Sequence, residues 1–403
     1  MSYDVEAVRR HFPALADGTA HFDGPGGSQT PRAVADAIRD TLLAGLSNRG
    51  RTTAAERRAD DTVTGARAAM GDLLGADPRG IVFGRSMTQL TYDLARTLAK
   101  EWGPGDEVVV SRLDHDANVR PWVQAAAAVG AQVRWIDFDP ERGELTAAHV
   151  AAELGPRTRL VALTGASNLI GTRPPLEEIG RLVHDAGALF AVDGVHLTAH
   201  AAVDVAALGA DFYTCSPYKF LGPHCGVLAS PPETLERLAP DKLLPSTDAV
   251  PERFELGTLP YELLAGTTAA VDFLAGLVPG EGSRRRRLIT ALEAVGEHED
   301  GLLRRAEEGL AELPGVTVWS RAARRTPTLL LTFDGRDAAD ACRFLAGRGV
   351  SAPAGSFYAL EPSRRLGLGD SGGLRAGLAP YTSGADVVRL LDGLAAFLAT
   401  PAG

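Results

Sequence analysis

Two stretches decide the fold of this chain: Ala188-Leu-Phe-Ala-Val-Asp-Gly-Val-His196, an apolar run that ends in an acid, and Tyr213-Thr-Cys-Ser-Pro-Tyr-Lys-Phe-Leu-Gly-Pro-His-Cys-Gly226, which places a lysine before Gly-Pro turns. The lysine, Lys219, follows the acid, Asp193, by 26 residues. Each stretch predicts a short buried strand with a polar side chain just past its end. An acid and a lysine at neighbouring strand ends can act on one ligand.

Pyridoxal phosphate (PLP) needs such a pair. A lysine amine forms a Schiff base with the cofactor aldehyde, and a carboxylate keeps the pyridine nitrogen protonated, so that the ring draws electrons from the substrate α-carbon. We therefore expect Lys219 and Asp193 to bind PLP in an enzyme of amino-acid chemistry. The alternatives are a surface lysine and a carboxylate that caps a helix. The apolar strand and the Gly-Pro turns around Lys219 argue against the first.

Composition allows such an enzyme. With 403 residues, 45% of them hydrophobic, the chain can form one large domain and a smaller one. The net charge of −10 argues against nucleic acid as a partner. The one dense basic run, Arg284–Arg287, is typical of a solvated helix face or a subunit contact.

The chain begins without a basic and apolar leader and has no apolar run of 18 residues, so we expect no membrane contact and a cytoplasmic location. Three cysteines, Cys215, Cys225 and Cys342, stand at irregular spacing. This spacing indicates neither a disulfide framework nor a metal site, and it fits a reducing compartment.

From about residue 64 to 230, short apolar strand candidates alternate with amphipathic helix candidates. This alternation predicts an α/β fold with a mostly parallel, seven-stranded sheet covered on both faces. Polar residues gather just past the strand ends, where ligands of such sheets bind. The expected strands are Gly80–Phe83, Glu107–Ser111, Gln132–Ile136, Arg159–Thr164, Leu189–Asp193, Phe212–Cys215 and Gly226–Ala229, and the expected helices are Thr88–Trp102, Pro121–Ala128, Leu176–Ala186 and Val203–Leu208.

After residue 262 the pattern becomes α+β. A helical segment from Tyr261 to about Leu313, broken near Pro279-Gly-Glu-Gly282, leads into a small C-terminal domain. We expect an N-terminal segment (1–20), a large PLP-binding domain (21–265), and a linking helix with the small domain (266–403). The small domain should contain strands at Val316–Trp319, Thr328–Phe333, Val350–Pro353 and Leu374–Leu378 and helices at Ala338–Gly347 and Ser383–Ala399.

The stretch Gly84-Arg-Ser-Met-Thr-Gln89 stands between a strand and a helix and is our candidate for the phosphate site. Its backbone N–H groups, that of Met87 included, can face an anion at the helix N-terminus. The hydroxyls of Ser86, Thr88 and Ser216 can join them. An ordinary helix cap is compatible with this role.

His115 and Asn168 follow two further strands. The flat imidazole of His115 can lie over the cofactor ring and move protons, although a lone histidine can also serve packing or turn hydrogen bonds. The amide of Asn168 can reach the phenolic oxygen of the cofactor. We expect both residues at the same site as Lys219.

Taken together, these segments resemble the class V aminotransferase family of fold type I PLP enzymes, and within it the cysteine-desulfurase-like group. The resemblance covers nearly the whole chain. It rests on Phe22-Asp-Gly-Pro-Gly-Gly-Ser-Gln-Thr-Pro31, the His115/Asn118 stretch, Ala166-Ser-Asn-Leu-Ile-Gly171, Val192-Asp-Gly-Val-His196, Ser216-Pro-Tyr-Lys219, Phe254-Glu-Leu-Gly-Thr-Leu-Pro260 and Gly373-Leu-Arg-Ala-Gly377.

The resemblance implies roles for individual residues. Lys219 would be the Schiff-base lysine, Asp193 would bind the pyridine nitrogen, and His115 would stack on the ring. A homodimer with a shared active site is also implied. The further assignments are Asn168 and His196 near the phenolic oxygen, Thr88, Ser216 and Tyr218 around the phosphate, Thr258 at the phosphate of the second subunit's site, and Arg375 on the substrate α-carboxylate.

The chain departs from the desulfurases at the catalytic cysteine. Desulfurases attack substrate sulfur with a cysteine on a mobile loop, whereas the matching stretch here, Ala352-Pro-Ala-Gly-Ser-Phe-Tyr-Ala-Leu-Glu361, contains none. In addition, residue 218 is Tyr where desulfurases have His, and residue 196 is His where they have Gln. Persulfide transfer is therefore not expected without a thiol from elsewhere.

The remaining residues support an external aldimine and a quinonoid, with the freed Lys219 as the base for the α-proton. We expect a β-eliminating carbon–sulfur lyase that acts on an amino acid. An aminotransferase and an amino-acid epimerase of the same family stay open as alternatives. A cofactor-binding protein without turnover is an alternative of another class, and the joint presence of Lys219, Asp193 and Arg375 argues against it.

Overall fold

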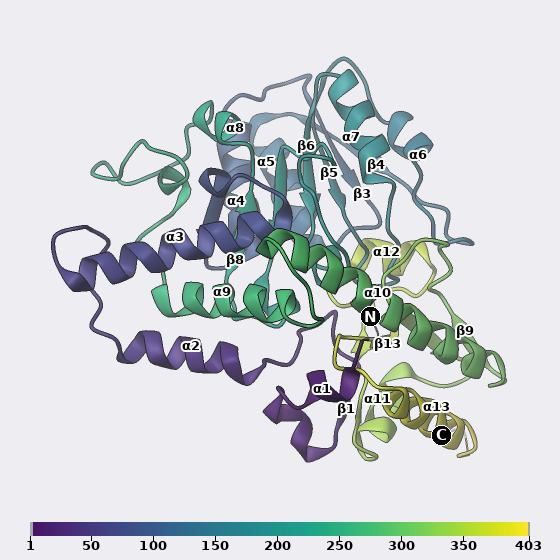
Figure 1. The fold of residues 1–403 in the computed structure, drawn as a ribbon. Coiled ribbons are helices and arrows are strands. Elements are labelled where there is room, and N and C mark those ends of the chain that lie inside the picture. Colours follow the sequence, from purple (N-terminus) through teal and green to yellow (C-terminus); the bar gives the residue numbers. More distant parts are fainter. Residues whose placement is uncertain (1–2, 402–403) are drawn as a thin grey trace.

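The computed structural model describes residues 3–401 and contains a seven-stranded sheet, a four-stranded sheet and a two-stranded pair (Figure 1). The large sheet has seven strands in the order β2-β8-β7-β6-β5-β3-β4. All neighbours are parallel except the two pairs that β8 forms, with β2 and with β7. The prediction of a mostly parallel seven-stranded sheet is confirmed. Its strands are β2 (Ile81–Gly84), β3 (Glu107–Ser111), β4 (Gln132–Ile136), β5 (Thr158–Thr164), β6 (Leu189–Asp193), β7 (Phe212–Cys215) and β8 (Gly226–Ala229).

Helices cover both faces of this sheet, because its strands are buried on both sides and need apolar partners on each. One face packs around Trp122 against α4 (Met87–Ala99), α5 (Arg120–Val129) and α8 (Pro232–Glu236). The other face forms the largest core with α3 (Ala54–Leu74), α6 (Ala147–Ala151), α7 (Leu176–Asp185), α9 (Tyr261–Ala275) and the first part of α10 (Arg284–Ala311). The result is an α/β/α layering (Figure 1).

The smaller sheet is antiparallel, in the order β12-β13-β10-β9. It shares a separate apolar core with the second half of α10 and with two later helices, as the α+β pattern predicts. The elements of this part are β9 (Val316–Val318), β10 (Thr328–Phe333), α11 (Ala338–Ala346), β11 (Val350–Ser351), β12 (Ala354–Gly355), α12 (Leu360–Arg365), β13 (Gly373–Gly377) and α13 (Gly384–Leu398).

The N-terminal residues pack against this C-terminal part. After α1 (Val5–Arg9), strand β1 (Ala20–His21) pairs in parallel with β11, and Asp23 forms a bridge with Gly377. Ala20 and the following Phe22 are fully buried in the core of the smaller sheet. Residues 20–23 thus lie beside residues 350–351 and 377, whereas the domain boundaries at residues 20 and 265 stay a prediction.

One predicted helix was wrong. Residues 203–208 form turns, because the backbone N–H of Val205 donates to the carbonyl of Leu74 and holds this segment beside α3. The two longest helices that the expected elements do not include are α2 (Arg32–Leu43) and α3, and the short helices α1, α6, α8 and α12 were not named either. The start of α3 does carry a signal, since Thr53 and Glu56 form a reciprocal capping box.

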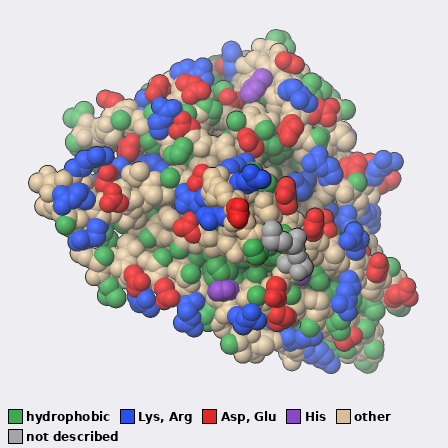
Figure 2. Space-filling model, viewed as in Figure 1, with side chains coloured by type: hydrophobic (Ala, Val, Ile, Leu, Met, Phe, Trp, Pro, Cys, Tyr) green, Lys and Arg blue, Asp and Glu red, His purple; other side chains and the backbone are tan. Residues whose placement is uncertain are grey.

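Charges of both signs are interspersed on the face of the molecule that Figure 2 shows. Within the basic run at the start of α10, Arg284 pairs with Asp72 at 2.7 Å and with Asp272 at 3.1 Å. Arg285 donates hydrogen bonds to the carbonyls of Asp72 and Leu73. These two arginines therefore fasten α10 to α3 and α9. Among residues 3–401, no helix has the length and apolarity to cross a membrane.

Candidate active site

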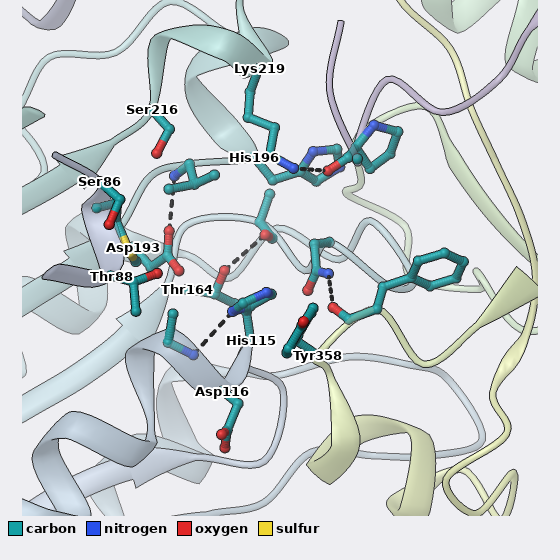
Figure 3. A pocket seen from close by; sticks show the side chains of 18 of the residues that line it. Ser86, Thr88, His115, Asp116, Thr164, Asp193, His196, Ser216, Lys219 and Tyr358 are labelled. Carbon is teal, nitrogen blue, oxygen red and sulfur yellow. Dashed lines mark hydrogen bonds between the residues drawn. The ribbon is translucent and has the colours of Figure 1, made fainter. Parts of the chain in front are cut away.

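A cavity of about 530 Å³ opens at the carboxyl ends of the parallel strands. In Figure 3, Lys219, Asp193 and His115 surround one space, Ser86, Thr88 and Ser216 gather at one side of it, and Tyr358 lies beside His115. The predicted site residues that line the cavity are Ser86, Met87, Thr88, His115, Asn168, Asp193, His196, Ser216, Tyr218, Lys219 and Arg375. Thr258 is exposed and lies outside this lining.

Lys219 lies in a 3₁₀ turn that follows β7. Its Nζ donates a hydrogen bond to the carbonyl oxygen of Pro25 and lies 4.8 Å from the centre of the Tyr218 ring. Burial, and then the positive charge of Arg375, lower the pKa of the Lys219 amine to about 8. Part of the amine is therefore neutral near pH 7, and the neutral form is the nucleophile and the base.

Asp193 ends β6 and is only 4% exposed. Its Oδ1 accepts a hydrogen bond from the backbone N–H of Val195 at 2.9 Å, and its carboxylate faces the cavity. Burial raises the pKa of Asp193 to about 6, although that hydrogen bond and the Lys219 charge act in the opposite direction. A cationic N–H donor in the cavity would relieve this cost, because it would stabilise the ionised carboxylate.

Asp114 is a second buried carboxyl group near Asp193, and sequence reasoning missed it. Its Oδ1 accepts from the Asn118 amide at 2.7 Å, while its Oδ2 has no partner among the described residues. Burial raises the pKa of Asp114 to about 8, and the charge of Asp193 adds to the shift. Asp114 is therefore mostly protonated at pH 7, which leaves Asp193 as the ionised member of the two. Its position in the stretch Asp114-His-Asp-Ala-Asn118 was the only available signal.

His115 caps a short 3₁₀ turn, since its Nδ1 accepts the backbone N–H of Ala117 at 3.0 Å. Burial, followed by the Lys219 charge, lowers the pKa of His115 to about 4. The ring is therefore neutral, with its proton on Nε2. A neutral flat ring suits packing against a cofactor better than proton transfer.

His196 and Asn168 are both held by the C-terminal part of the chain. The Nε2 of His196 lies 2.8 Å from the Thr326 hydroxyl and 2.9 Å from that of Thr328. The Asn168 amide donates to the carbonyl of Phe357 at 3.0 Å, and its Oδ1 is without a partner in the described part of the chain. The amide N–H that we assigned to a phenolic oxygen thus already has one acceptor.

The side of the cavity below α4 is suited to an anion. Ser86 caps α4 by accepting the backbone N–H of Gln89 at 3.1 Å. The first-turn N–H groups of Met87 and Thr88 have no partner within the helix, as at any helix start. Ser216 and Tyr218 approach from the turn after β7, and the Tyr218 ring stacks on His224 at 4.5 Å.

Arg375, on β13, is 1% exposed. One of its η-nitrogens binds Asp23 at 2.7 Å and the other the carbonyl of Asn168 at 3.0 Å. The ring of Phe357 covers the guanidinium at 3.7 Å. Sequence analysis did not predict four of the lining residues, Asp23, Pro25, Phe357 and Tyr358. The first two lie in the stretch Phe22–Pro31, which supported the family resemblance. The last two lie in Ala352–Glu361, the stretch in which desulfurases have their catalytic cysteine.

The sequence matches the family model described as Aminotransferase class-V over residues 20–390. The chain belongs to this family. It is therefore a PLP-dependent enzyme.

Class V relatives align with almost all of the chain. A probable cysteine desulfurase of Pseudomonas aeruginosa is 32% identical over 94% of this chain and 95% of its own. The uncharacterized protein MT3887 of Mycobacterium tuberculosis is 33% identical over 98% and 99%. The crystal structure of the cysteine desulfurase CsdA of Escherichia coli superimposes with a TM-score of 0.86 at 29% identity, over 98% of both chains.

The cavity has the chemistry that PLP requires of a class V enzyme. It has an amine with a lowered pKa in Lys219, a buried carboxylate with spare acceptor capacity in Asp193, and an uncharged ring in His115. Asn168 also presents a buried oxygen without a partner among the described residues. Hydroxyls and helix N–H groups stand at one end, where a phosphate would bind. The residues present therefore fit the cofactor.

The cysteines of this class V enzyme lie away from the reaction space. Among the described residues, no cysteine lines the cavity. Cys215 and Cys225 are buried, and burial raises the pKa of each thiol, to about 11 for Cys225. Cys342 lies on α11, before the loop that leads to Phe357 and Tyr358. Protonated, buried thiols are poor nucleophiles.

Proposed function

We propose that this protein is a β-eliminating lyase that cleaves a carbon–sulfur bond of an amino acid. The observation that carries the proposal is the pair Phe357 and Tyr358, which the loop after β12 brings to the cavity that Lys219, Asp193 and Arg375 also line. A desulfurase needs a thiol at this loop to accept sulfur from its substrate. Elimination needs none, because the sulfur leaves as a thiolate.

The residues of the chain divide the work. Arg375 binds the substrate α-carboxylate with its planar fork. With the cofactor bound, the neutral amine of Lys219 would remove the α-proton, Asp193 would stabilise the protonated pyridine nitrogen, and His115 would help to hold the cofactor and exclude water. Bound PLP supplies an electron sink for the α-carbon. The Cβ–S bond then breaks, thiolate leaves with the bonding pair, and the 2-aminoacrylate product hydrolyses in water to pyruvate and ammonia.

We also assign residues that bind the phosphate and the phenolic oxygen of the cofactor. We assign the phosphate to the start of α4 and the turn after β7, and the phenolic oxygen to the neighbourhood of the β5 and β6 ends. Support comes from the cavity lining and from the helix N–H groups that face it. The residues are Ser86, Met87, Thr88, Ser216 and Tyr218 for the phosphate, with Thr258 of the partner subunit, and Asn168 and His196 for the phenolic oxygen.

We also propose a cytoplasmic homodimer with shared active sites. Leu42, Leu43 and Leu256 are 64%, 79% and 54% exposed, and Leu256 lies two residues before Thr258. Large apolar side chains that are exposed in a single subunit are typical of a surface that a second subunit covers. Sedimentation should give a dimer. Mixed dimers of Lys219→Ala and Thr258→Ala subunits should keep one intact site if Thr258 acts across the interface.

The reaction is tested with L-cysteine, S-substituted cysteines and ordinary amino acids, scored for pyruvate and ammonia. Elimination predicts both products, in equal amounts, and none with Lys219→Ala. Racemised substrate without pyruvate would instead show an epimerase, and a 2-oxo acid formed only with an amino acceptor would show an aminotransferase. If the protein binds the cofactor but converts none of these substrates, it is a cofactor-binding protein without turnover.

A further inference from the structure

Two consecutive residues at the cavity have a backbone conformation that side chains disfavour. Phe357 and Tyr358 have φ values of +54° and +57°, in the left-handed region. For large residues this conformation is uncommon and costly, because the Cβ atom crowds the backbone. Such strain persists where surrounding contacts enforce it, and it gathers at functional sites.

Hydrogen bonds fix the backbone of this pair. The carbonyl of Phe357 accepts from the Asn168 amide at 3.0 Å, and that of Tyr358 accepts from the backbone N–H of Asp116 at 2.7 Å. Just beyond, Glu361 on α12 pairs with Arg112 at 3.0 Å. The loop is thus fastened to residues that follow the neighbouring strands β5 and β3 of the large sheet.

Core packing does not explain the position of the Tyr358 ring. The residue is 76% exposed, yet it lines the cavity, and its ring centre lies 5.6 Å from that of His115 at an angle of 34° (Figure 3). The Phe357 ring is engaged differently, over the Arg375 guanidinium. The strained backbone therefore presents the Tyr358 ring to the cavity. The ring of the neighbouring Phe357 instead packs over Arg375, the arginine that we assign to the substrate carboxylate.

We propose that Tyr358 is a specificity-determining residue, and that its ring binds a planar, unsaturated or aromatic substituent on the sulfur of the substrate. This inference rests on the proposed elimination of a thiolate from an S-substituted cysteine. Phe357 acts with it as a positioning residue for Arg375. The substrates are then cysteine conjugates with an aryl or arylmethyl group on the sulfur, rather than free cysteine.

The charges at the cavity mouth favour a neutral substituent. Asp116 and Arg120, the charged lining residues near Tyr358, pair with each other at 2.8 Å. Each charge is offset by the other in this pair, so it attracts an ionic group less than an isolated charge would, whereas an exposed aromatic face gains from contact with another ring. A cavity of about 530 Å³ is within the range of about 300 to 1,000 Å³ that ligands of substantial size occupy.

The test compares kcat/KM for S-benzyl-L-cysteine and S-methyl-L-cysteine in wild type and three variants. Tyr358→Asn and Tyr358→Gly remove the ring, and both residues tolerate the left-handed backbone, so the loop keeps its course. Tyr358→Phe keeps the ring and removes only the hydroxyl. We expect wild type and Tyr358→Phe to prefer the benzyl substrate by about tenfold, the upper range for an aromatic pair, and Tyr358→Asn and Tyr358→Gly to lose that preference.

Affinity is measured separately by titrating each ligand against the absorbance of the bound cofactor. If wild type shows no benzyl preference, or if Tyr358→Asn retains it, the role of Tyr358 is disproved. If no substrate yields pyruvate, the proposed elimination fails, and the titration still decides the specificity: benzyl affinity that falls in Tyr358→Asn and Tyr358→Gly but not in Tyr358→Phe supports it, and equal affinity in all four proteins overturns it. Loss of affinity for both ligands in every variant would show that the Tyr358 ring only supports the structure of the loop.

Discussion

Arg375 and Asp23 form a 2.7 Å ion pair across 352 residues of sequence, with the arginine buried and the aspartate half-exposed. A guanidinium stays charged when it is buried, and such a partner offsets the cost of removing that charge from water. The pair also directs the fork of Arg375 along the cavity wall, where its Nε has no partner among the described residues. A substrate carboxylate would meet an arginine that is already oriented.

Replacing this arginine tests the carboxylate role. Arg375→Lys keeps the charge and loses the planar fork, so kcat/KM for an amino acid should fall by about tenfold or more. The visible band of the bound cofactor should persist. The control is the decarboxylated analogue of the same substrate, which should lose little. Equal losses on both compounds would reduce Arg375 to a structural residue.

Sodium borohydride should attach the cofactor permanently to Lys219. The chain has only three lysines, and the other two, Lys100 and Lys242, pair with Asp241 and Asp248 outside the cavity. Peptide mapping after reduction should therefore give one labelled peptide, and Lys219→Ala should give none. A label on Lys100 or Lys242 would show that the assignment is wrong.

Cofactor capture by the apoenzyme should depend on pH through Lys219. The attacking species is the neutral amine, so the rate should rise from about pH 6 and level off above the lowered pKa of about 8. Arg375→Gln removes a positive charge that lowers this pKa, so the midpoint should move to higher pH. The rate is followed by the growth of the visible band. A profile without a rise, or a shift to lower pH in Arg375→Gln, contradicts the assignment.

Asp193→Ala should weaken cofactor retention and slow α-proton exchange. Breaking a buried pair by removing one partner costs on the order of 3 kcal/mol or more, or about a hundredfold. Exchange is measured as deuterium incorporation into a substrate in heavy water. Asp193→Glu, which keeps the charge, is the matched control and should retain part of the rate. Normal exchange in the alanine variant would exclude this role for Asp193.

No persulfide should form during turnover. Cys215 and Cys225 are buried with raised thiol pKa values, and Cys342 is not among the residues that line the cavity. Intact-mass measurement after incubation with L-cysteine should show an unmodified chain, with a relative that carries the loop cysteine as positive control. A gain of one sulfur atom on any cysteine would restore the desulfurase interpretation.

The large sheet could be predicted from the sequence because its strands are short, apolar runs with turn residues on both sides. The side chains past their ends, from Ser86 to Lys219, followed from that topology, since parallel strands bring their carboxyl ends to one edge. Residues 203–208 could not be predicted, because a hydrogen bond to Leu74, far away in sequence, sets their course.

The same limit explains the residues of the site that were missed. Asp23 and Pro25 reach Arg375 and Lys219 because β1 pairs with β11 and Asp23 forms a bridge with Gly377. No local pattern records such a contact. The left-handed backbone of Phe357 and Tyr358 contradicts their intrinsic preference, so tertiary contacts alone produce it.

The pairing of the first strand with the last part of the chain has a consequence for biosynthesis. Asp23 leaves the ribosome 352 residues before Arg375, which corresponds to about 20 to 70 s at about 5 to 20 residues per second. Until β11 (Val350–Ser351) has been made, late in that interval, β1 has no partner strand, while the large sheet can already be complete. A nascent chain arrested before residue 350 therefore has β1 without its partner strand and Asp23 without Arg375, however well its large sheet has folded.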